Sequence, residues 1–292
     1  MFQNKSLKIE DFIYLSNDKN IEQVAQHIKE ADAILIGAGA GMGVDSGLPD
    51  FRGKAGFWRA YPPLAKRGLR FEEMANPYWF TKKPSLAWGF YGHRLNLYQK
   101  TKPHCGFNIL LNKFKEENIP MFVFTSNVDS HFQKTGFEEN QIMECHGSLM
   151  HFQCIEECGQ PIWPIGPDLL LQINPDNLLA EEPLPSCPQC GSLARPNILM
   201  FSDFAWNSTR TYAQRQRFEK WIEKFKNKNL LIIELGAGTN IPTVRLTCEE
   251  VYQSSGNQFI RINPWESECG LKNTLSLLMS AKDAIKAISQ NQ

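Results

Sequence analysis

The chain has 292 residues, 42% of them hydrophobic, and its 31 basic side chains balance 31 acidic ones. This length and composition are sufficient for one large or two modest globular domains with a real core. The formal net charge of zero gives no sign of a nucleic-acid footprint or a basic membrane surface. We find no signal-peptide pattern and no apolar run near transmembrane length. We therefore expect a cytoplasmic protein whose eight cysteines are thiols or metal ligands rather than disulfides.

The first predicted elements are an amphipathic helix over residues 20–31 and a short buried strand over residues 33–36. Four glycines follow at every second position from Gly37 to Gly43, a spacing that a regular helix or strand does not tolerate. The exposed backbone N–H groups of such a turn can bind the phosphates of a nucleotide, although a tight bend alone would also explain the glycines. The dehydrogenase fingerprint G-x-G-x-x-G fails in every frame, which disfavours a nicotinamide dehydrogenase.

Residues 54–100 begin with aromatic residues and prolines and then predict two helices. We interpret this segment as a helical insertion over the glycine turn. A helix over residues 107–117 leads to a strand over residues 121–124, which ends in the polar segment from Thr125 to Asp129. Open α/β sheets bind ligands just past the carboxyl ends of buried strands, although a turn rich in Asn and Asp needs no ligand to explain it.

A second short strand ends at Glu144-Cys145-His146-Gly147. A lone histidine at such a break is usually a hydrogen-bonded loop residue, but neutral imidazole also has the pKa that a general base needs near pH 7. Cys145 suggests a Cys-His nucleophile as an alternative. We disfavour that alternative because adjacent residues on a strand point to opposite faces.

Two cysteine pairs, Cys154 with Cys158 and Cys187 with Cys190, have the short spacings that chelate a metal. Four thiolates arranged in two such pairs are typical of a tetrahedral structural zinc site, which leaves no open position for catalysis. We therefore predict that these four cysteines bind zinc and that the metal is structural.

The final third returns to an α/β pattern. It predicts a strand over residues 230–233, a glycine-containing segment from Gly236 to Asn240, a last strand over residues 259–263, and a helix over residues 281–288 that closes the sheet.

Taken together, these motifs resemble those of the sirtuin family, whose cofactor loop runs G-A-G-x-S-x-x-x-G-I-P-D-F-R. The best register places G-A-G on residues 39–41 and P-D-F-R on residues 49–52, with Gly43 where the family has Ser. The other motif groups follow in the family's order over nearly the whole chain. The resemblance implies an α/β fold with a Rossmann-like parallel sheet and helices on both faces. It also implies a smaller lobe made of the helical insertion and a four-cysteine zinc ribbon.

The same resemblance implies how the chain is divided and which cofactors it uses. Residues 1–53, 101–147 and 205–292 would form the NAD-binding domain. Residues 54–100 would form the helical insertion and residues 148–204 the zinc-binding module, so that NAD and structural zinc are the expected cofactors.

By resemblance, the NAD-binding residues lie in the motif turns, and His146 is the general base, with Asn127 as a second catalytic residue. The implied NAD contacts are Gly39, Ala40, Gly41, Asp50, Phe51, Arg52, Ser126, Asn127, Asp129, Gly236, Ala237, Gly238 and Asn263. Besides Gly43, three further positions of the cofactor pocket depart from the family. Ser126 replaces a Gln, and Ala237 and Gly238 replace two hydroxyl-bearing residues. A shift that puts Gly238-Thr239 on the family's G-T is left open.

For the substrate, the stretch from Arg195 to Asp203 is similar to the family's R-P-x-V-V-x-F-G-E, which lines the acyl-lysine tunnel and pairs with the substrate backbone. Leu199, Met200 and Phe201 are the implied contacts. Tyr91 and Arg94 fall three residues apart on a predicted helix and resemble the Y-x-x-R of sirtuins that prefer succinyl- or malonyl-lysine. The simpler alternative is that Tyr91 is half-buried and Arg94 faces solvent.

The resemblance implies an NAD-dependent protein lysine deacylase that acts on acylated lysines of protein substrates and releases nicotinamide and O-acyl-ADP-ribose. We expect no nucleic-acid or membrane partner. Two alternatives remain at this point. One is an NAD glycohydrolase or ADP-ribosyltransferase on the same scaffold, and the other is an NAD-sensing binding module without turnover.

Overall fold

A computed structural model of the chain describes residues 9–49, 54–166, 168–255 and 258–291. The chain separates into two compact units. The first, here called the sheet unit, contains Met1–Asp45, His104–Phe124 and Glu219–Gln292. The second, here called the cysteine unit, contains Ser46–Pro103 and Thr125–Phe218. Each unit is described by itself below.

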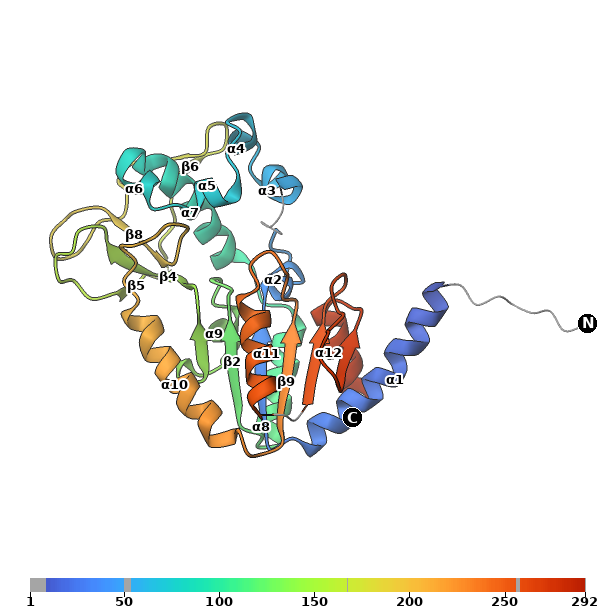
Figure 1. The fold of residues 1–292 in the computed structure, drawn as a ribbon. Coiled ribbons are helices and arrows are strands. Elements are labelled where there is room, and N and C mark those ends of the chain that lie inside the picture. Colours follow the sequence, from blue (N-terminus) through green and yellow to red (C-terminus); the bar gives the residue numbers. More distant parts are fainter. Residues whose placement is uncertain (1–8, 50–53, 167, 256–257, 292) are drawn as a thin grey trace, which may run out of the picture. The chain divides into compact units, whose positions relative to one another are not determined.

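The sheet unit is built on parallel strands, of which β1 and β9 are buried along their whole length. The β1–β9, β9–β10 and β10–β11 pairs are parallel, and the described strands of this unit have the order β11-β10-β9-β1-β2. The near-continuous apolar runs in β1 and β9 suit a sheet that is covered on both faces. Figure 1 shows α11 in front of the strands and α8 and α12 behind them. The bounds are α1 Ile9–Glu30, β1 Ala33–Ala38, α2 Ala40–Val44, α8 Cys105–Glu116, β2 Met121–Thr125, β9 Leu230–Leu235, α11 Thr243–Ser255, β10 Gln258–Ile262, β11 Thr274–Leu277 and α12 Ala281–Gln290.

The cysteine unit combines a run of helices with small antiparallel sheets. β5, β4 and β8 form one sheet, and β6 pairs with β7 in another. The helices and strands are α3 Lys54–Ala60, α4 Pro62–Lys66, α5 Phe71–Met74, α6 Tyr78–Lys82, α7 Pro84–Lys100, α9 His131–Thr135, the 3₁₀ turn Glu139–Gln141, β3 Ile142–Glu144, β4 Gly147–Cys154, β5 Trp163–Pro164, β6 Ile173–Asn174, β7 Leu179–Ala180 and β8 Ala194–Ile198. Helix α10 (Thr209–Phe225) begins in this unit.

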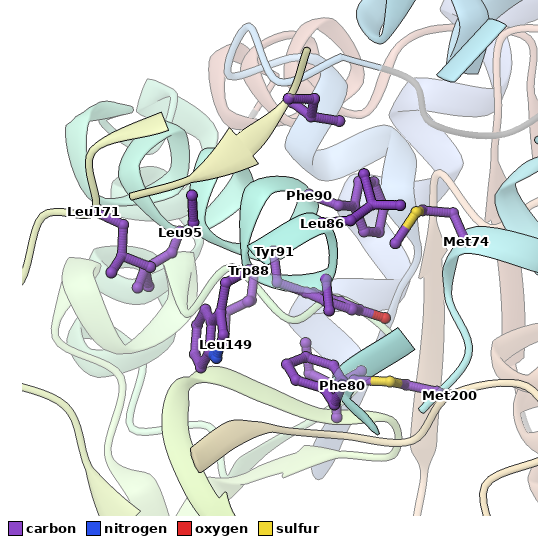
Figure 2. Packing of buried hydrophobic residues seen from close by; sticks show 14 of the residues in the cluster. Met74, Phe80, Leu86, Trp88, Phe90, Tyr91, Leu95, Leu149, Leu171 and Met200 are labelled. Carbon is purple, nitrogen blue, oxygen red and sulfur yellow. The ribbon is translucent and has the colours of Figure 1, made fainter. Parts of the chain in front are cut away.

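Helix α7 is the centre of the cysteine unit's hydrophobic core. Phe80 stacks on Tyr91 with ring centroids 5.7 Å apart, and Trp88 meets Phe152 edge-on at 5.0 Å. Figure 2 shows Tyr91 lying over Phe80, with Met200 beside them. The helix also approaches a backbone closely, since a Cβ on Gly89 would lie 1.9 Å from the carbonyl oxygen of Leu178. Because a helical glycine normally costs about 1 kcal/mol relative to Ala, this contact explains its presence.

The predicted fold class is confirmed, since a parallel sheet with helices and a cluster of four cysteines are both present. Several shorter elements were not predicted, and in the sheet unit two larger ones were missed. Strand β11 lies beyond the strand that we took as the last, and α11 was not predicted. Among the described residues, no helix is long and apolar enough to cross a membrane.

Candidate functional site

Three loops leave the sheet unit at the same level. In register, Ala38 of β1 lies beside Leu235 of β9, which lies beside Ile262 of β10. The next residues, Gly39, Gly236 and Asn263, therefore start three neighbouring loops at the carboxyl edge of the sheet. The backbone continues the pairing, because Gly39 N–H donates to Leu235 at 2.9 Å and Gly236 N–H donates to Ile262 at 2.9 Å. This edge is where open α/β sheets bind their ligands.

The glycines of these loops bring two backbones into contact. A Cβ on Gly39 would lie 2.5 Å from the Cα of Ala237, and one on Gly41 would lie 2.7 Å from the Cα of Gly236. Gly236 also has a φ of +59°, a left-handed conformation that favours glycine. The close approach that we inferred from the glycine spacing is thus present, and Gly236 and Ala237 are the residues that Gly41 and Gly39 approach.

Asn263 fixes the loop that it begins. Its side-chain N–H donates to the carbonyl oxygen of Ala237 at 2.9 Å, and its side-chain oxygen accepts from the N–H groups of Trp265 and Glu266. Glu266 in turn accepts hydrogen bonds from the backbone N–H and hydroxyl of Thr239 at 3.1 and 2.8 Å. The loops after β9 and β10 are therefore held as one rigid structure.

A buried ion pair lies beneath these loops. Arg261 of β10 bonds to Glu234 of β9 at 2.7 and 2.9 Å and also reaches Glu249 of α11 at 2.6 Å. Burial raises the pKa of Glu234, and the two arginines near it, Arg261 and Arg245, oppose that rise. Charges inside a parallel sheet are costly unless they are paired, so the hydrogen-bonded pair also fixes the relation of β9 to β10.

In the cysteine unit, the candidate base is joined by its backbone to two other candidate segments. Leu199 N–H donates to the carbonyl oxygen of His146 at 3.0 Å. Cys145 N–H donates to Thr125 at 2.9 Å, and the Thr125 hydroxyl accepts from Asn127 N–H at 3.0 Å. The structure therefore brings the His146 segment, the polar turn after β2 and the start of the predicted substrate segment together. The side chains of Asn127 and His146 are half-buried, and Asp129 is buried.

Gly147, directly after the candidate base, has a φ of +78°, and a Cβ there would lie 2.1 Å from the carbonyl oxygen of Asn197. Glycine is therefore required at this position. The alternative nucleophile Cys145 is buried, and burial raises the pKa of its thiol to about 12. A thiol with this pKa is protonated near neutrality and is a poor nucleophile.

Helix α10 holds Glu144, two residues before His146, through three groups. Arg210 pairs with its carboxylate at 2.5 Å, Gln214 accepts from its N–H at 3.0 Å, and Thr211 donates to its carbonyl oxygen at 3.3 Å. Burial raises the pKa of Glu144, and Arg210 opposes that rise. This clamp was not predicted from the sequence. The one local feature that could have indicated it is a charged residue, Glu144, at the end of an apolar strand.

The segment that follows β8 is anchored at both ends. Arg195 donates to Asp203 at 3.0 Å and to the Ile198 carbonyl oxygen at 3.1 Å, while Met200 N–H donates to Asp203 at 3.2 Å. At the far end, Gln153 of β4 donates to the carbonyl oxygen of Ala205 at 2.9 Å. Between these anchors Leu199 and Phe201 are exposed, and Met200 is buried.

Tyr91 and Arg94 are both buried on α7, with 1% and 8% of their surfaces exposed. The simpler alternative, a half-buried Tyr91 and a solvent-facing Arg94, was wrong because both side chains lie inside the aromatic core. Arg94 donates from Nε and Nη2 to the Tyr98 hydroxyl at 3.3 and 2.8 Å, and it lies over the rings of Phe90 and Tyr98. Burial raises the pKa of Tyr91.

The four cysteines converge as predicted. All four Sγ atoms lie within 4.8 Å of one another, with Cys154 and Cys190 at 3.6 Å and Cys158 and Cys187 at 3.7 Å. Tetrahedral zinc with Zn–S bonds of about 2.3 Å requires S···S separations of about 3.8 Å. Gly191, with a φ of +74°, lets the second pair turn back, and its N–H donates to the Cys187 carbonyl oxygen at 2.9 Å. The donor set and its dimensions fit a structural zinc ion.

Asp50, Phe51 and Arg52, which we predicted to contact NAD, lie outside the described residues. The remaining predicted contacts are divided between the two units. Those in the sheet unit are Gly39, Ala40, Gly41, Gly236, Ala237, Gly238 and Asn263, and those in the cysteine unit are Ser126, Asn127 and Asp129.

The fold and these sites define an α/β protein of Rossmann-like architecture with a four-cysteine metal module. A family model described as "Sir2 family" matches residues 39–239. The chain belongs to the Sir2 family, which confirms the resemblance to sirtuins.

Among curated relatives, a protein of Pyrococcus abyssi (strain GE5 / Orsay) named NAD-dependent protein deacylase is 32% identical over 247 residues, which cover 85% of this chain and 88% of that protein. A protein of Aquifex aeolicus (strain VF5) with the same name is 30% identical, covering 80% of this chain and 84% of that protein.

Solved structures show the same fold. A Sir2 homolog in complex with NAD superposes with a TM-score of 0.67 at 23% identity, covering 92% of each chain. A mutant Sir2 homologue in complex with ADP-ribose gives a TM-score of 0.68 at 23% identity, covering 92% of this chain and 95% of that one.

Proposed function

We propose that this member of the Sir2 family is an NAD-dependent protein deacylase, which transfers an acyl group from lysine to the ADP-ribose of NAD and releases nicotinamide. The observation that carries the proposal is the position of His146. It follows a buried strand, and its carbonyl oxygen accepts a hydrogen bond from Leu199, in the segment proposed to bind substrate. A binding module needs no base, and the relatives named as deacylases support turnover.

In this proposal, NAD supplies the sugar that receives the acyl group. His146 removes a proton from a ribose hydroxyl, and Asn127 is a second catalytic residue in the neighbouring turn. The clamp on Glu144 keeps the His146 backbone in place. Because an amide oxygen is a weak nucleophile, much of the rate should come from holding the reactants in line.

We also propose that several loops bind NAD together. The backbone groups of the Gly39–Gly41 and Gly236–Gly238 segments would hold phosphates and ribose, and Asn263 would lie near the adenosine. Asp50, Phe51, Arg52, Ser126 and Asp129 complete the proposed set. Cys154, Cys158, Cys187 and Cys190 would hold a structural zinc ion. The division into an NAD-binding domain and a small lobe at the boundaries given above also stays a proposal, as does the cytoplasmic location.

For the substrate, we include Leu199, Met200 and Phe201 as the residues that receive an acylated lysine of a protein. The two anchors of this segment support the assignment, because they leave Leu199 and Phe201 exposed while their backbone is fixed. An extended polypeptide can add to such a segment as a strand.

We further propose that the acyl group is acidic, as in succinyl- or malonyl-lysine. The support is the burial of Arg94 among Phe90, Tyr91 and Tyr98. A guanidinium in an apolar setting attracts a carboxylate strongly because little water screens the pair. The Tyr91 hydroxyl would add a hydrogen bond.

One experiment separates this proposal from its alternatives. The protein is incubated with NAD, with and without an acyl-lysine peptide, and the products are identified by mass spectrometry. We expect nicotinamide release that requires the peptide and yields O-acyl-ADP-ribose. Free ADP-ribose formed at the same rate without peptide would identify a glycohydrolase instead, and ADP-ribose attached to protein would identify an ADP-ribosyltransferase. NAD binding without any product would identify a binding module.

A further inference from the structure

Positive charge is concentrated in the helical insertion, residues 54–100. This segment contains nine Lys and Arg residues but only two acidic residues, Glu72 and Glu73. Because the whole chain is formally neutral, the rest of it has seven more acidic than basic residues. A concentration of like charge bears on association rather than on the fold, and it attracts partners of opposite charge.

Four of these basic residues, Arg59, Lys66, Arg67 and Arg70, are exposed within a stretch of twelve residues. Arg70 is paired with Glu73 at 3.3 Å, so its charge is largely cancelled. Among the residues that the structure describes, Arg59 and Lys66 form no ion pair. Arg59, Lys66 and Arg67 are here termed the basic cluster.

The backbone that carries the basic cluster is fixed by two contacts. The indole N–H of Trp58 donates to the carbonyl oxygen of Leu69 at 2.8 Å, which joins α3 to the chain after α4. Arg67 donates from Nη2 to the carbonyl oxygen of Asn177 at 3.1 Å, which joins the same stretch to the turn between β6 and β7. A partner therefore meets charges at set positions, and less freedom is lost when it binds.

The basic cluster lies beside the segment proposed to bind substrate. Phe201 N–H donates at 2.9 Å to the carbonyl oxygen of Ala75, directly after α5. The Phe201 ring meets that of Phe71 edge-on at 6.1 Å, and Phe71 meets Phe57 of α3 at 5.7 Å. Two ring contacts therefore connect Phe201 to the helix that carries Arg59. The two contacts together span at most about 12 Å, which an extended polypeptide covers in about four residues.

We propose that the basic cluster binds acidic residues that flank the acylated lysine of a protein substrate, about three to six positions away from it. This inference rests on the proposed deacylase function and names a class of substrate for it. Charge complementarity supports a polypeptide occupant, because carboxylates along an extended chain that adds beside Phe201 can pair with Arg59 and Lys66. Phe57 and Tyr61 are buried, so their rings are not available for stacking on the bases of a nucleic acid.

The test uses acyl-lysine peptides that carry the same acyl group and differ only at the positions about three to six residues from the lysine. These positions are Glu in one peptide, Gln in a second and Lys in a third. Dissociation constants are measured by fluorescence anisotropy without NAD, and kcat and KM are measured with NAD, at about 50 and about 500 mM salt.

Two variants with the same change of net charge are compared. Arg59→Glu/Lys66→Glu reverses two charges of the basic cluster. Lys19→Glu/Lys220→Glu reverses two exposed charges, on α1 and α10, and is the matched control.

We expect the wild type to bind the Glu peptide about fivefold to tenfold more tightly than the Gln peptide at low salt, and the difference should shrink at high salt. In turnover the preference should appear in KM rather than in kcat. The Arg59→Glu/Lys66→Glu variant should lose the preference and still bind and convert the Gln peptide like the wild type. The Lys19→Glu/Lys220→Glu control should keep the preference.

Equal binding of the three peptides by the wild type would overturn the inference, as would the same loss of preference in the control, because net charge alone would then act. Weaker binding of every peptide by the Arg59→Glu/Lys66→Glu variant would show that these residues only support the fold. A single-stranded oligonucleotide that binds more tightly than the Glu peptide, and is released by the same variant, would show a nucleic-acid surface instead. If the wild type preferred the Glu peptide but converted none of the peptides, the deacylase function would fail and the basic cluster would still bind acidic polypeptides.

Discussion

The two units hold their candidate site residues in different ways. In the sheet unit, Gly39, Gly236 and Asn263 are level because three parallel strands end in register. In the cysteine unit, the His146 segment is held by contacts with segments far away in sequence, such as the Glu144–Arg210 pair. The first arrangement depends on backbone shape and the second on side-chain partners. Different kinds of substitution should therefore disrupt the candidate site residues of the two units.

The largest effect should come from the metal module. Cys187→Ser removes one of four thiolates, and since structural zinc contributes about 10–16 kcal/mol of apparent binding energy in zinc-finger peptides, the cysteine unit should lose its packing. We expect about one zinc per chain in the wild type and loss of both zinc and near-ultraviolet circular dichroism in the variant. Cys105→Ser, at an exposed cysteine, is the control. A metal-free protein with full activity would refute the zinc assignment.

The next effect is on catalysis. His146→Ala should lower peptide deacylation by ~10² or more, the scale for losing a positioned general base, while NAD binding stays nearly intact. Turnover is measured by O-acyl-ADP-ribose formation and binding by calorimetry. His27→Gln, in α1 of the sheet unit, controls for the general loss of a histidine. Unchanged turnover in the His146 variant would show that the base lies elsewhere.

Acyl preference tests a side-chain contact inside the cysteine unit. Succinyl-lysine should be preferred to acetyl-lysine, and Arg94→Met should reverse that order by roughly a hundredfold, since a charge-assisted pair contributes about 2–3 kcal/mol. The measurement is kcat/KM for both peptides. Tyr98→Phe removes a hydroxyl partner of Arg94 and is the control for disturbed packing. Equal loss of both activities in Arg94→Met means that the residue supports the fold, and the acidic-acyl proposal should then be dropped.

Backbone shape is tested in the sheet unit. Gly39→Ala places a methyl group 2.5 Å from the Cα of Ala237, and since neither backbone can move freely, we expect a stability loss of about 1–3 kcal/mol and weaker ADP-ribose binding. Gly270→Ala is the matched control, because a Cβ there meets nothing within 4 Å. Denaturant unfolding and calorimetry measure the two effects. If both variants bound ADP-ribose like the wild type, the close approach of the two loops would not matter for binding.

The same contrast explains what could be predicted from the sequence. The glycine spacing, the strand at residues 33–36 and the two cysteine pairs are local patterns, and each indicates a backbone shape or a chelating geometry directly. The edge strand β11 was missed because Thr274–Leu277 is only four residues long and is half-buried at three positions. Gln153, Arg210 and the burial of Arg94 were missed because their partners or their packing depend on the tertiary fold, which no local pattern encodes.

The most gradual predicted effect is on the pH dependence of stability, and it arises from one side chain of the cysteine unit. Burial lowers the pKa of His151 on β4 to about 4, and the charge of Arg210 adds to the decrease. In the unfolded chain the same imidazole has its ordinary value of about 6.5. Between pH 6.5 and pH 4 the unfolded state therefore binds a proton that the folded state does not, so the free energy of unfolding should fall as the pH falls through this range.

One proton contributes at most ~1.4 kcal/mol per pH unit to this decrease. His151→Gln should make the profile flatter over the same range, as measured by urea unfolding at pH 7, 6, 5 and 4. Burial raises the pKa of Glu144, so its carboxylate takes up a proton in the folded state at a higher pH than in the unfolded state. This protonation makes the free energy of unfolding rise as the pH falls, which is opposite to the effect of His151. Because Glu144 is present in both proteins, the difference between their profiles isolates His151. Parallel profiles would show that the imidazole is accessible enough to titrate normally in the folded state.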